Sequence, residues 1–297
     1  MVFMTGASGF VGSNLVRELL KEGDGVRCLL REPERPGHLA PASGVEIVKG
    51  DVTDRASILK ALEGGDIDCV IHLVGILFEQ GDQTFGKIHV EATENVVAAC
   101  RECGVRRYIQ MSALGTREKA RSEYHRTKWG AEEIVMASGL TYTIFRPSVI
   151  FGEEDRFTNL FSGIMRRSPF VAIPGSGENR MQPLFIDDLV KAIVTTVKTV
   201  GHGQKVYDVG GLKEFTFNEI IDMIAKATGK RRVKVHLPMP LMRPCAALAE
   251  KLLSTPPITR DQLLMLEEDN VTGVNALTEV FGIIPTGFEE GMRRYLH

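Results

Sequence analysis

Apolar and polar residues follow a pattern that predicts short strands alternating with helices through the first half of the chain. Val2–Met4 is an apolar run, and Phe10–Glu22 repeats apolar residues at the 3.6-residue period of an amphipathic helix. Further strands are predicted at 25–30, 45–48, 69–75, 107–111 and 142–145, and further helices at 54–62, 84–103 and 122–137. Strands that alternate with helices form right-handed units around a parallel sheet. The pattern therefore predicts an α/β fold with a doubly wound parallel sheet.

The regularity loosens after residue 146, where glycine and proline become frequent. We predict long loops there, with helices at 187–200, 217–228, 240–253, 259–266 and 277–281 and strands at 205–209 and 233–237. Residues 1–146 should form the main domain. Residues 147–297 should form mainly a small C-terminal lobe, and segments at about 187–210 should return to the main domain.

A glycine-rich turn, Thr5 to Gly12, joins the first strand to the first helix with the spacing GxxGxxG. Gly6 would permit a tight turn, Gly9 would let the backbone approach a pyrophosphate, and Gly12 would let the helix pack closely on the strand. Free amides and the helix dipole would then hold the anion. An ordinary glycine-rich turn is the alternative. The strand before it and the helix after it favour a Rossmann-type dinucleotide-binding domain over residues 1–146.

The residue that ends the second strand bears on the choice of dinucleotide. An acidic residue there binds the ribose 2′-hydroxyl of NAD, whereas Arg31 stands at this place, with Arg35 nearby. A guanidinium suits a 2′-phosphate, so NADP(H) is favoured and NAD(H) is the second option. A solvated loop arginine is the alternative explanation of Arg31. Asp51 and Gly75 lie at the ends of later strands, where open α/β sheets bind ligands.

Composition narrows the classes of function. The net charge is −2, which does not suggest a nucleic-acid-binding protein. Five scattered cysteines indicate a reducing compartment rather than a disulfide framework. Cys100 and Cys103 match CxxC, but no second Cys/His pair lies at zinc-like spacing, and we predict no metal site. Because residue 1 leads directly into a strand, we expect no signal peptide and a cytoplasmic location. No apolar run approaches the length of a membrane span.

A second constellation carries candidate chemistry. Tyr124 and Lys128 lie one helical turn apart, so their side chains share a face. A phenol titrates near about 10, so acid/base work at neutral pH needs its pKa lowered by roughly three units. A nearby ammonium and a cationic nicotinamide ring could supply much of that shift. Ser112, at the end of the fifth strand, is placed to hydrogen-bond a substrate oxygen. A surface Tyr/Lys pair is the alternative.

Together these motifs resemble one superfamily, the extended or atypical short-chain dehydrogenase/reductases, also called NAD-dependent epimerase/dehydratases. The resemblance covers essentially the whole chain. It rests on TGxxGxxG at Thr5–Gly12, GDVTD at Gly50–Asp54, Ser112, YxxxK at Tyr124–Lys128, and the segments Arg146–Gly152 and Arg180–Asp188. Within the superfamily, the chain is similar to the group of the NADPH-binding accessory subunit of respiratory complex I. This finer resemblance rests on His72–Ile76, Met111–Gly115 and Phe281–Pro285.

The resemblance implies roles for individual residues. Tyr124 would be the acid/base, Lys128 would bind the nicotinamide ribose and lower the phenol's pKa, and Ser112 would orient the substrate. The predicted cofactor-binding residues are Gly6, Ser8, Gly9, Phe10, Val11, Gly12, Arg31, Asp51, Val52, Leu73, Val74, Gly75, Tyr124, Lys128, Pro147, Ser148 and Val149. Many relatives carry an asparagine that orders a proton-relay water, and His89 is its equivalent here. His89 could instead be a packed helical histidine.

We therefore predict an NADP(H)-dependent oxidoreductase or epimerase that transfers hydride at a carbonyl or secondary alcohol of a small molecule. The alternative is a cofactor-binding assembly or regulatory protein of a respiratory or quinone pathway with little or no turnover. We expect a monomer or homodimer with no integral membrane segment. The apolar segment 240–253 is interpreted as a helix that covers the substrate lobe, and a helix at a membrane surface is the alternative.

Overall fold

The computed structural model of the protein describes residues 1–40 and 42–296. Contacts divide the chain into two compact units. The first unit comprises Met1–Ala120, Tyr124–Arg146 and Leu189–Tyr207. The second unit comprises Arg121–Glu123, Pro147–Asp188 and the chain from Asp208 onward. That these units are a cofactor domain and a substrate lobe stays a prediction.

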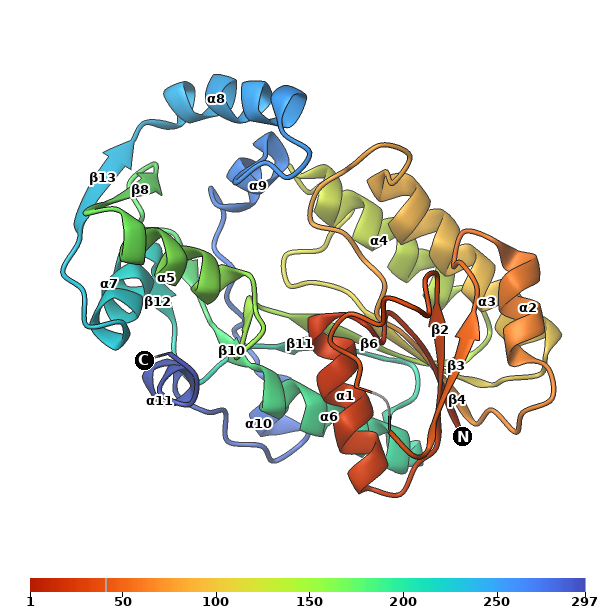
Figure 1. Cartoon of the computed structure of the whole chain (residues 1–297). Coiled ribbons are helices and arrows are strands. Elements are labelled where there is room, and N and C mark those ends of the chain that lie inside the picture. The colour runs from red at the N-terminus through yellow and green to blue at the C-terminus, as the bar shows by residue number, and fades with distance from the viewer. Residues whose placement is uncertain (41, 297) are drawn as a thin grey trace. The chain divides into compact units, whose positions relative to one another are not determined.

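A seven-stranded sheet is the centre of the first unit (Figure 1). Its spatial order is β11 (Lys205–Val209), β6 (Thr141–Pro147), β5 (Arg107–Met111), β4 (Cys69–His72), β1 (Val2–Thr5), β2 (Val26–Leu30) and β3 (Val45–Lys49). The pairs from β6 to β3 are parallel, so these strands end at the same edge. The strand order reverses between β1 and β4, and ligands of open α/β sheets bind at such a reversal. The predicted doubly wound parallel sheet is confirmed.

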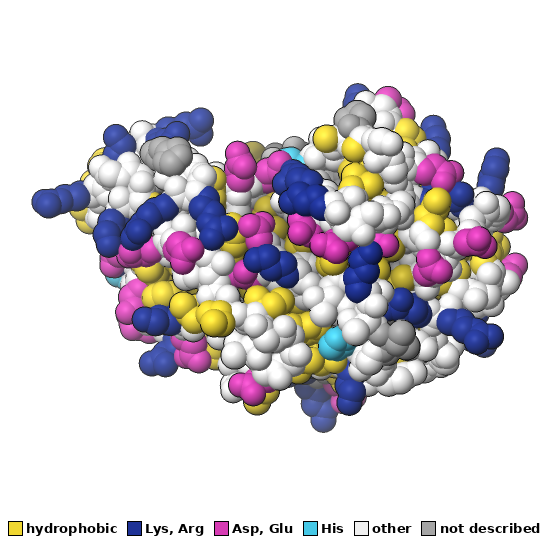
Figure 2. All heavy atoms as spheres, turned by 90° about the horizontal axis from the view of Figure 1, so that it is seen from below, with side chains coloured by type: hydrophobic (Ala, Val, Ile, Leu, Met, Phe, Trp, Pro, Cys, Tyr) yellow, Lys and Arg dark blue, Asp and Glu magenta, His cyan; other side chains and the backbone are white. Residues whose placement is uncertain are grey.

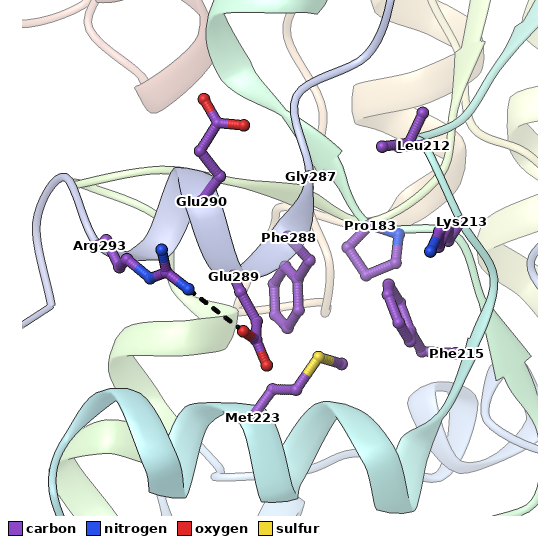
Figure 3. Close-up of a pocket in the computed structure, with 10 residues that line it drawn as sticks. All are labelled: Pro183, Leu212, Lys213, Phe215, Met223, Gly287, Phe288, Glu289, Glu290 and Arg293. Atoms are coloured by element: carbon purple, nitrogen blue, oxygen red, sulfur yellow. Dashed lines mark hydrogen bonds and ion pairs between the residues drawn. The ribbon is translucent and has the colours of Figure 1, made fainter.

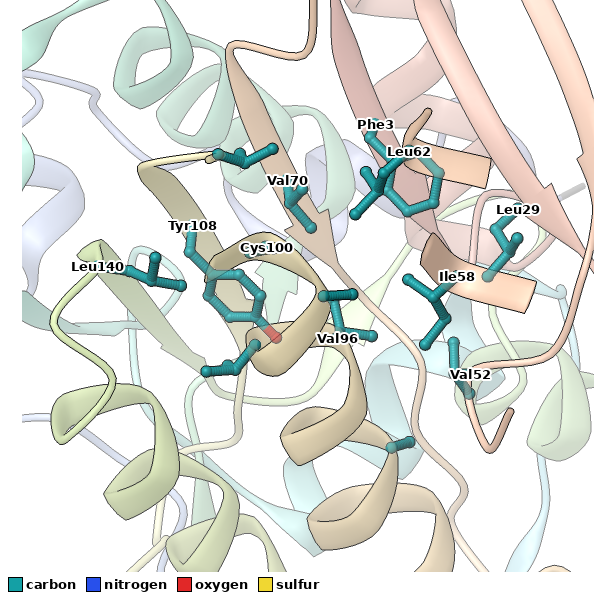
Figure 4. Packing of buried hydrophobic residues seen from close by; sticks show 14 of the residues in the cluster. Phe3, Leu29, Val52, Ile58, Leu62, Val70, Val96, Cys100, Tyr108 and Leu140 are labelled. Atoms are coloured by element: carbon teal, nitrogen blue, oxygen red, sulfur yellow. The ribbon is translucent and has the colours of Figure 1, made fainter. Parts of the chain in front are cut away.

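Helices cover both faces of this sheet. The first face carries α1 (Phe10–Lys21) and α6 (Ile186–Lys198), and the second carries α2 (Arg55–Leu62), α3 (Ala92–Glu102) and α4 (Glu123–Met136) (Figure 1). Phe3, Val70 and Tyr108 extend from three adjacent strands toward the second face, where they pack with Ile58 and Val96 (Figure 4). Successive residues of a strand point to opposite faces of the sheet. Because these strands are apolar at both odd and even positions, the sheet can bury both faces.

The helix predicted at 84–103 is not one regular helix. It opens with a turn of π-helix, Gly86–Glu91, and continues as α3. The predicted helix is confirmed, and the π-helical geometry of its start is a feature that the sequence did not indicate. π-Helical turns are rare and are often found at functional sites. His89, one of the residues singled out above, lies in this turn.

The described strands of the second unit pair two by two. These pairs are β7 (Ile150–Phe151) with β10 (Leu184–Phe185), β9 (Arg180–Met181) with β12 (Phe215–Thr216), and β8 (Phe170–Pro174) with β13 (Val233–Leu237). The helices are α5 (Phe157–Arg167), α7 (Phe217–Ala227), α8 (Met239–Leu252), α9 (Arg260–Met265), α10 (Ala276–Glu279) and α11 (Phe288–Met292). The expected long loops are wrong for α5 and α11. In α5, Phe157 and Phe161 pack edge to face against Phe217 of α7, so tertiary contacts support a helix in a segment rich in breakers.

Candidate active site

The glycine turn between β1 and α1 depends on the absence of side chains. Gly6 has a φ of +78°, a conformation that other residues rarely adopt. A Cβ atom on Gly12 would lie 2.2 Å from the carbonyl oxygen of Gly6, so only glycine lets α1 start this close to the turn. A Cβ on Gly9 would meet only the Gly6 oxygen, at 3.4 Å. The space beside Gly9 is therefore open.

The start of α1 has the features of an anion site. Its N-cap, Gly9, provides no side-chain hydrogen bond, and the first turn has no acidic residue. The first amides and the positive end of the dipole are thus left for an anion. The loop after β2 reaches the same turn, because the His38 amide donates to the Ser8 carbonyl over 3.2 Å. Arg31, at the start of this loop, is exposed. The geometry fits a dinucleotide, and the cofactor roles of these residues stay predictions.

Two further predicted cofactor segments follow β3 and β4, which lie on either side of β1 and β2 in the sheet. Asp51, after β3, accepts hydrogen bonds from the amide and the hydroxyl of Thr53, both at 2.9 Å. After β4, the Leu73 amide donates to the Thr5 carbonyl over 3.2 Å, which ties this segment to β1. A Cβ on Gly75 would lie 2.9 Å from the Lys128 Nζ atom. Gly75 therefore leaves the room that the lysine side chain needs.

Lys128 is a buried cation. Its side chain leaves α4 and its Nζ atom donates to the Met111 carbonyl, at the end of β5, over 3.1 Å. Burial lowers the pKa of Lys128 to about 8, although the Glu132 carboxylate opposes this shift. The ammonium thus lies beside Gly75 at the ends of β4 and β5, at the sheet edge where the glycine turn also lies.

Tyr124, one turn before Lys128, is also buried. Its ring packs edge to face against His89, with centroids 5.3 Å apart, and against Phe85, with centroids 6.0 Å apart. Burial raises the pKa of Tyr124 to about 12. The expectation that the ammonium lowers this pKa is therefore wrong for the groups of the chain itself, since desolvation of the phenolate dominates. Tyr124 keeps its proton at neutral pH.

Ser112 belongs to a buried network that the sequence pattern did not reveal. Its hydroxyl donates to Glu132 Oε1 over 2.5 Å, and the Glu132 side chain is fully buried. The Arg146 guanidinium holds both oxygens of Glu132, with Nε–Oε1 and Nη2–Oε2 distances of 2.8 and 2.5 Å. The Ser112 hydrogen is thus directed to Glu132, and the oxygen keeps its acceptor capacity. The available signal was position, because Glu132 follows Lys128 by one helical turn.

His89 is held at both ring nitrogens. Its Nε2 atom accepts from the Ile76 amide over 3.2 Å, and its Nδ1 atom lies 2.9 Å from the Thr127 hydroxyl oxygen. Thr127 donates its hydrogen to the Tyr124 carbonyl, so Nδ1 must be the donor to Thr127. Burial, aided by the Lys128 charge, lowers the pKa of His89 to about 2. His89 is therefore a neutral tie between α4 and the segment after β4, with no ring nitrogen left for a relay water.

The remaining predicted cofactor residues, Pro147, Ser148 and Val149, belong to the second unit. Ser148 is buried, and its hydroxyl donates to Asn270 Oδ1 over 2.6 Å. Its oxygen also accepts from the Gln182 amide. These bonds give Ser148 a structural role inside its own unit, and the cofactor role stays a prediction.

The second unit contains a cavity of about 410 Å³, between α7, α11 and the segments that follow β9 and β11 (Figure 3). Its lining residues are Pro183, Leu212, Lys213, Phe215, Met223, Gly287, Phe288, Glu289, Glu290 and Arg293. Glu289 forms an ion pair with Arg293, at 3.4 Å, and the apolar lining of the cavity includes Phe215, Phe288 and Met223. None of the predicted site residues lines it.

Known proteins that are similar to this chain identify its family. Residues 2–210 match the model of the NAD dependent epimerase/dehydratase family. The chain belongs to this family. The predicted superfamily is therefore confirmed, and its members among the relatives include epimerases and reductases as well as a complex I subunit.

Individual relatives cover most of the chain. It is 30% identical over 286 residues to NADH dehydrogenase (ubiquinone) 1 alpha subcomplex subunit 9, mitochondrial, of Arabidopsis thaliana, covering 92% of this chain and 71% of that protein. It is 27% identical over 262 residues to the ceramide reductase of Caulobacter vibrioides, covering 87% and 81%. The structure of an NADPH-dependent quinone oxidoreductase of Escherichia coli, complexed with NADPH, has a TM-score of 0.81 at 18% identity and full coverage of both chains, which shows a common fold.

The next observations concern the cellular location and the oligomeric state. Over residues 1–40 and 42–296, no helix has both the length and the hydropathy that crossing a bilayer requires. The Arabidopsis relative is named as a mitochondrial protein, so the cytoplasmic location of this chain stays a prediction. The same holds for its expected state as monomer or homodimer.

Proposed function

We propose that this member of the epimerase/dehydratase family is an NADP(H)-dependent oxidoreductase that reduces a carbonyl group of a small molecule. The observation that carries the proposal is the buried placement of Tyr124 and Lys128 on one face of α4, with the Lys128 ammonium at the ends of β4 and β5. Ser112 follows the last residue of β5, so the three residues belong to segments at one edge of the sheet.

The chemistry requires a hydride and a proton. A bound nicotinamide cofactor would supply the hydride. Tyr124 would donate its phenolic proton to the carbonyl oxygen as the carbonyl carbon becomes a secondary alcohol carbon, and water would then reprotonate the phenolate. The Lys128 ammonium would stabilise that phenolate. Burial raises the pKa of Tyr124 to about 12, so the phenol carries at neutral pH the proton that this reduction requires.

Replacement of Tyr124 by phenylalanine tests this proposal. Loss of the proton donor should reduce NADPH-dependent turnover by roughly 10²–10⁴-fold, while NADPH affinity changes little. Turnover would be measured on a panel of 3-oxoacyl, aliphatic ketone and quinone substrates, and affinity by NADPH fluorescence. Tyr142→Phe is the matched control. It makes the same change near the start of β6, at the sheet edge opposite the one with Tyr124, and should retain activity. Full activity of Tyr124→Phe would refute the mechanism.

The preference for NADP(H) is supported by Arg31, an exposed guanidinium after β2, and by the absence of an acidic residue at that position. A hydrogen bond to a charged phosphate contributes about 1.5–3 kcal/mol, so Arg31→Ala should weaken NADPH binding about 10- to 100-fold and leave NADH binding unchanged. Arg55→Ala on α2, where Arg55 pairs with Glu102, is the control. Tighter binding of NADH than of NADPH by the unmodified protein would contradict this preference.

A cofactor-binding assembly or regulatory role is the second candidate. Two observations favour it: the relative at 30% identity is named as a subunit of a respiratory enzyme, and both ring nitrogens of His89 are occupied. This function requires tight NADPH binding without turnover on any carbonyl of the panel, and a stable complex with respiratory or quinone-pathway proteins. NADPH oxidation that depends on both substrate and Tyr124 would exclude it.

A further inference from the structure

Helix α8 exposes its most apolar face. Leu241, Leu248 and Leu252 are 62%, 58% and 72% exposed, and together with the exposed Cys245 they recur at the spacing of a single helical face. Within α8 the buried residue is Ala246, and the helix contacts α9. The interpretation of α8 as a cover for the lobe is therefore wrong for this leucine face.

The strand pair that precedes α8 continues the apolar exposure. Phe170 of β8 pairs in register with Val233 of β13, and these side chains are 56% and 58% exposed. Val235, two residues along β13 and hence on the same face, is also exposed. A single residue separates β13 from α8. In the second unit, β8, β13 and α8 lie in succession along one border (Figure 1). We call these residues of β8, β13 and α8 the apolar border.

Positive charge is concentrated beside the apolar border. The segments 165–175 and 229–238, which contain β8 and β13, hold no acidic residue and the basic residues Arg166, Arg167, Lys230, Arg231, Arg232 and Lys234. Of these, Lys234 is paired with Asp222 of α7, at 2.7 Å. Lys230, Arg231 and Arg167 are exposed, and no ion pair of theirs is found in the described part of the chain. On the face shown in Figure 2, by contrast, basic and acidic side chains are interspersed.

We propose that the apolar border and its basic flank form a docking surface for a lipid bilayer that contains anionic lipids. Exposed leucine, valine and phenylalanine side chains would enter the interface, and Arg167, Lys230 and Arg231 would contact lipid phosphates. A bilayer offers an apolar layer and a layer of negative charge over the whole length of this border. A second copy of the chain is a poor occupant, because a symmetric dimer would bring two basic flanks together. Nucleic acid would leave the leucine face exposed.

Co-sedimentation with vesicles tests this proposal. The intact chain should bind vesicles of phosphatidylcholine with roughly a third of phosphatidylglycerol, should bind pure phosphatidylcholine much more weakly, and should release as salt rises. Each basic residue near the surface contributes roughly fivefold in partitioning, so Lys230→Glu/Arg231→Glu should lower binding at least about 25-fold. Lys49→Glu/Lys60→Glu makes the same change at exposed lysines of the first unit and should not lower vesicle binding.

The apolar contribution has its own variant and control. Leu248→Ser/Leu252→Ser should lower partitioning by roughly 100-fold, because each buried leucine contributes about tenfold or more. Val274→Ser/Ile284→Ser, at exposed positions of the same unit outside the border, should bind like the unmodified chain. Far-UV circular dichroism verifies the fold of each variant.

Three results would overturn the proposal. The intact chain could stay in the supernatant with both vesicle types. It could bind both types equally, independently of salt. Finally, analytical ultracentrifugation could show self-association that the leucine variant abolishes, which would make a second copy the occupant.

Discussion

The buried pair of Glu132 and Arg146 leads to a quantitative prediction. Glu132 has no exposed side-chain surface, the Arg146 side chain is 19% exposed, and two hydrogen bonds join them. Removing one charge leaves the other desolvated and without the opposite charge of this ion pair. Removing both charges leaves no such penalty.

The expected magnitudes follow from this asymmetry. Glu132→Gln and Arg146→Met should each lower the free energy of unfolding by about 3–5 kcal/mol, since each removes one half of a buried ion pair and leaves the other half in place. The double variant should lose far less than the sum of the two, about 1–3 kcal/mol, because neither half of the ion pair is then left in the unit without the other. The coupling energy of the double-mutant cycle should therefore be about 3 kcal/mol or more in favour of the native pair.

Urea unfolding followed by tryptophan fluorescence measures this cycle. The chain has one tryptophan, and the Arg146 guanidinium carbon lies 5.8 Å from the centre of its ring, so Trp129 reports on the unit that contains the pair. The slope of the free energy of unfolding against urea concentration should be equal in all four proteins if the transition is the same. Additive losses, or a loss below about 1 kcal/mol for Glu132→Gln, would refute the inference that the pair is desolvated and coupled.

Three further predictions concern the same unit. Burial lowers the pKa of His72 to about 3 and that of His89 to about 2, from 6.5, so stability present above pH 6.5 is lost as the pH falls. The loss should be about 2 kcal/mol per histidine at pH 5, and urea midpoints at pH 7.5 and 5 that do not differ would contradict it. Gly12→Ala should destabilise the fold by about 3 kcal/mol through its backbone clash. Gly9→Ala, which has room, should change the urea midpoint little and weaken NADPH binding, as titration would show. Because the Lys128 pKa falls from 10.5 to about 8, burial of its charge opposes folding at neutral pH. Lys128→Met should therefore raise the free energy of unfolding by about 1–2 kcal/mol while abolishing turnover, and a destabilised variant would refute this.

Regular elements could be predicted where the local pattern is strong. The helices α1 and α4 and the strand β5 have nearly their expected bounds, whereas β4 ends at His72, three residues earlier than expected. The π-helical turn at Gly86–Glu91 could not be predicted, because its residues have no pattern that separates it from an α-helix. Its His89 side chain bonds the Ile76 amide across the chain, and such a contact is visible only after folding.

The candidate site shows the same division. Spacing alone places Tyr124 and Lys128 on one helical face, and the glycine turn predicts an anion site at the start of α1. The direction of the Ser112 hydroxyl was unforeseen, because Glu132 comes from α4 and Arg146 from the end of β6. Among the groups of the chain itself, burial raises the pKa of Tyr124, which was unforeseen because the sequence reveals a nearby ammonium but not the depth of burial.

The sequence by itself determined the order of strands and helices up to residue 146, the family and the residues of the glycine turn and the YxxxK pair, because these depend on periodicity and short spacings. Tertiary structure alone decided how buried each charge is, which partner each polar group has and which face of α8 remains uncovered. The reason is physical: local conformational preference acts between neighbours in the chain, whereas desolvation and hydrogen-bond pairing depend on groups that folding brings from distant segments.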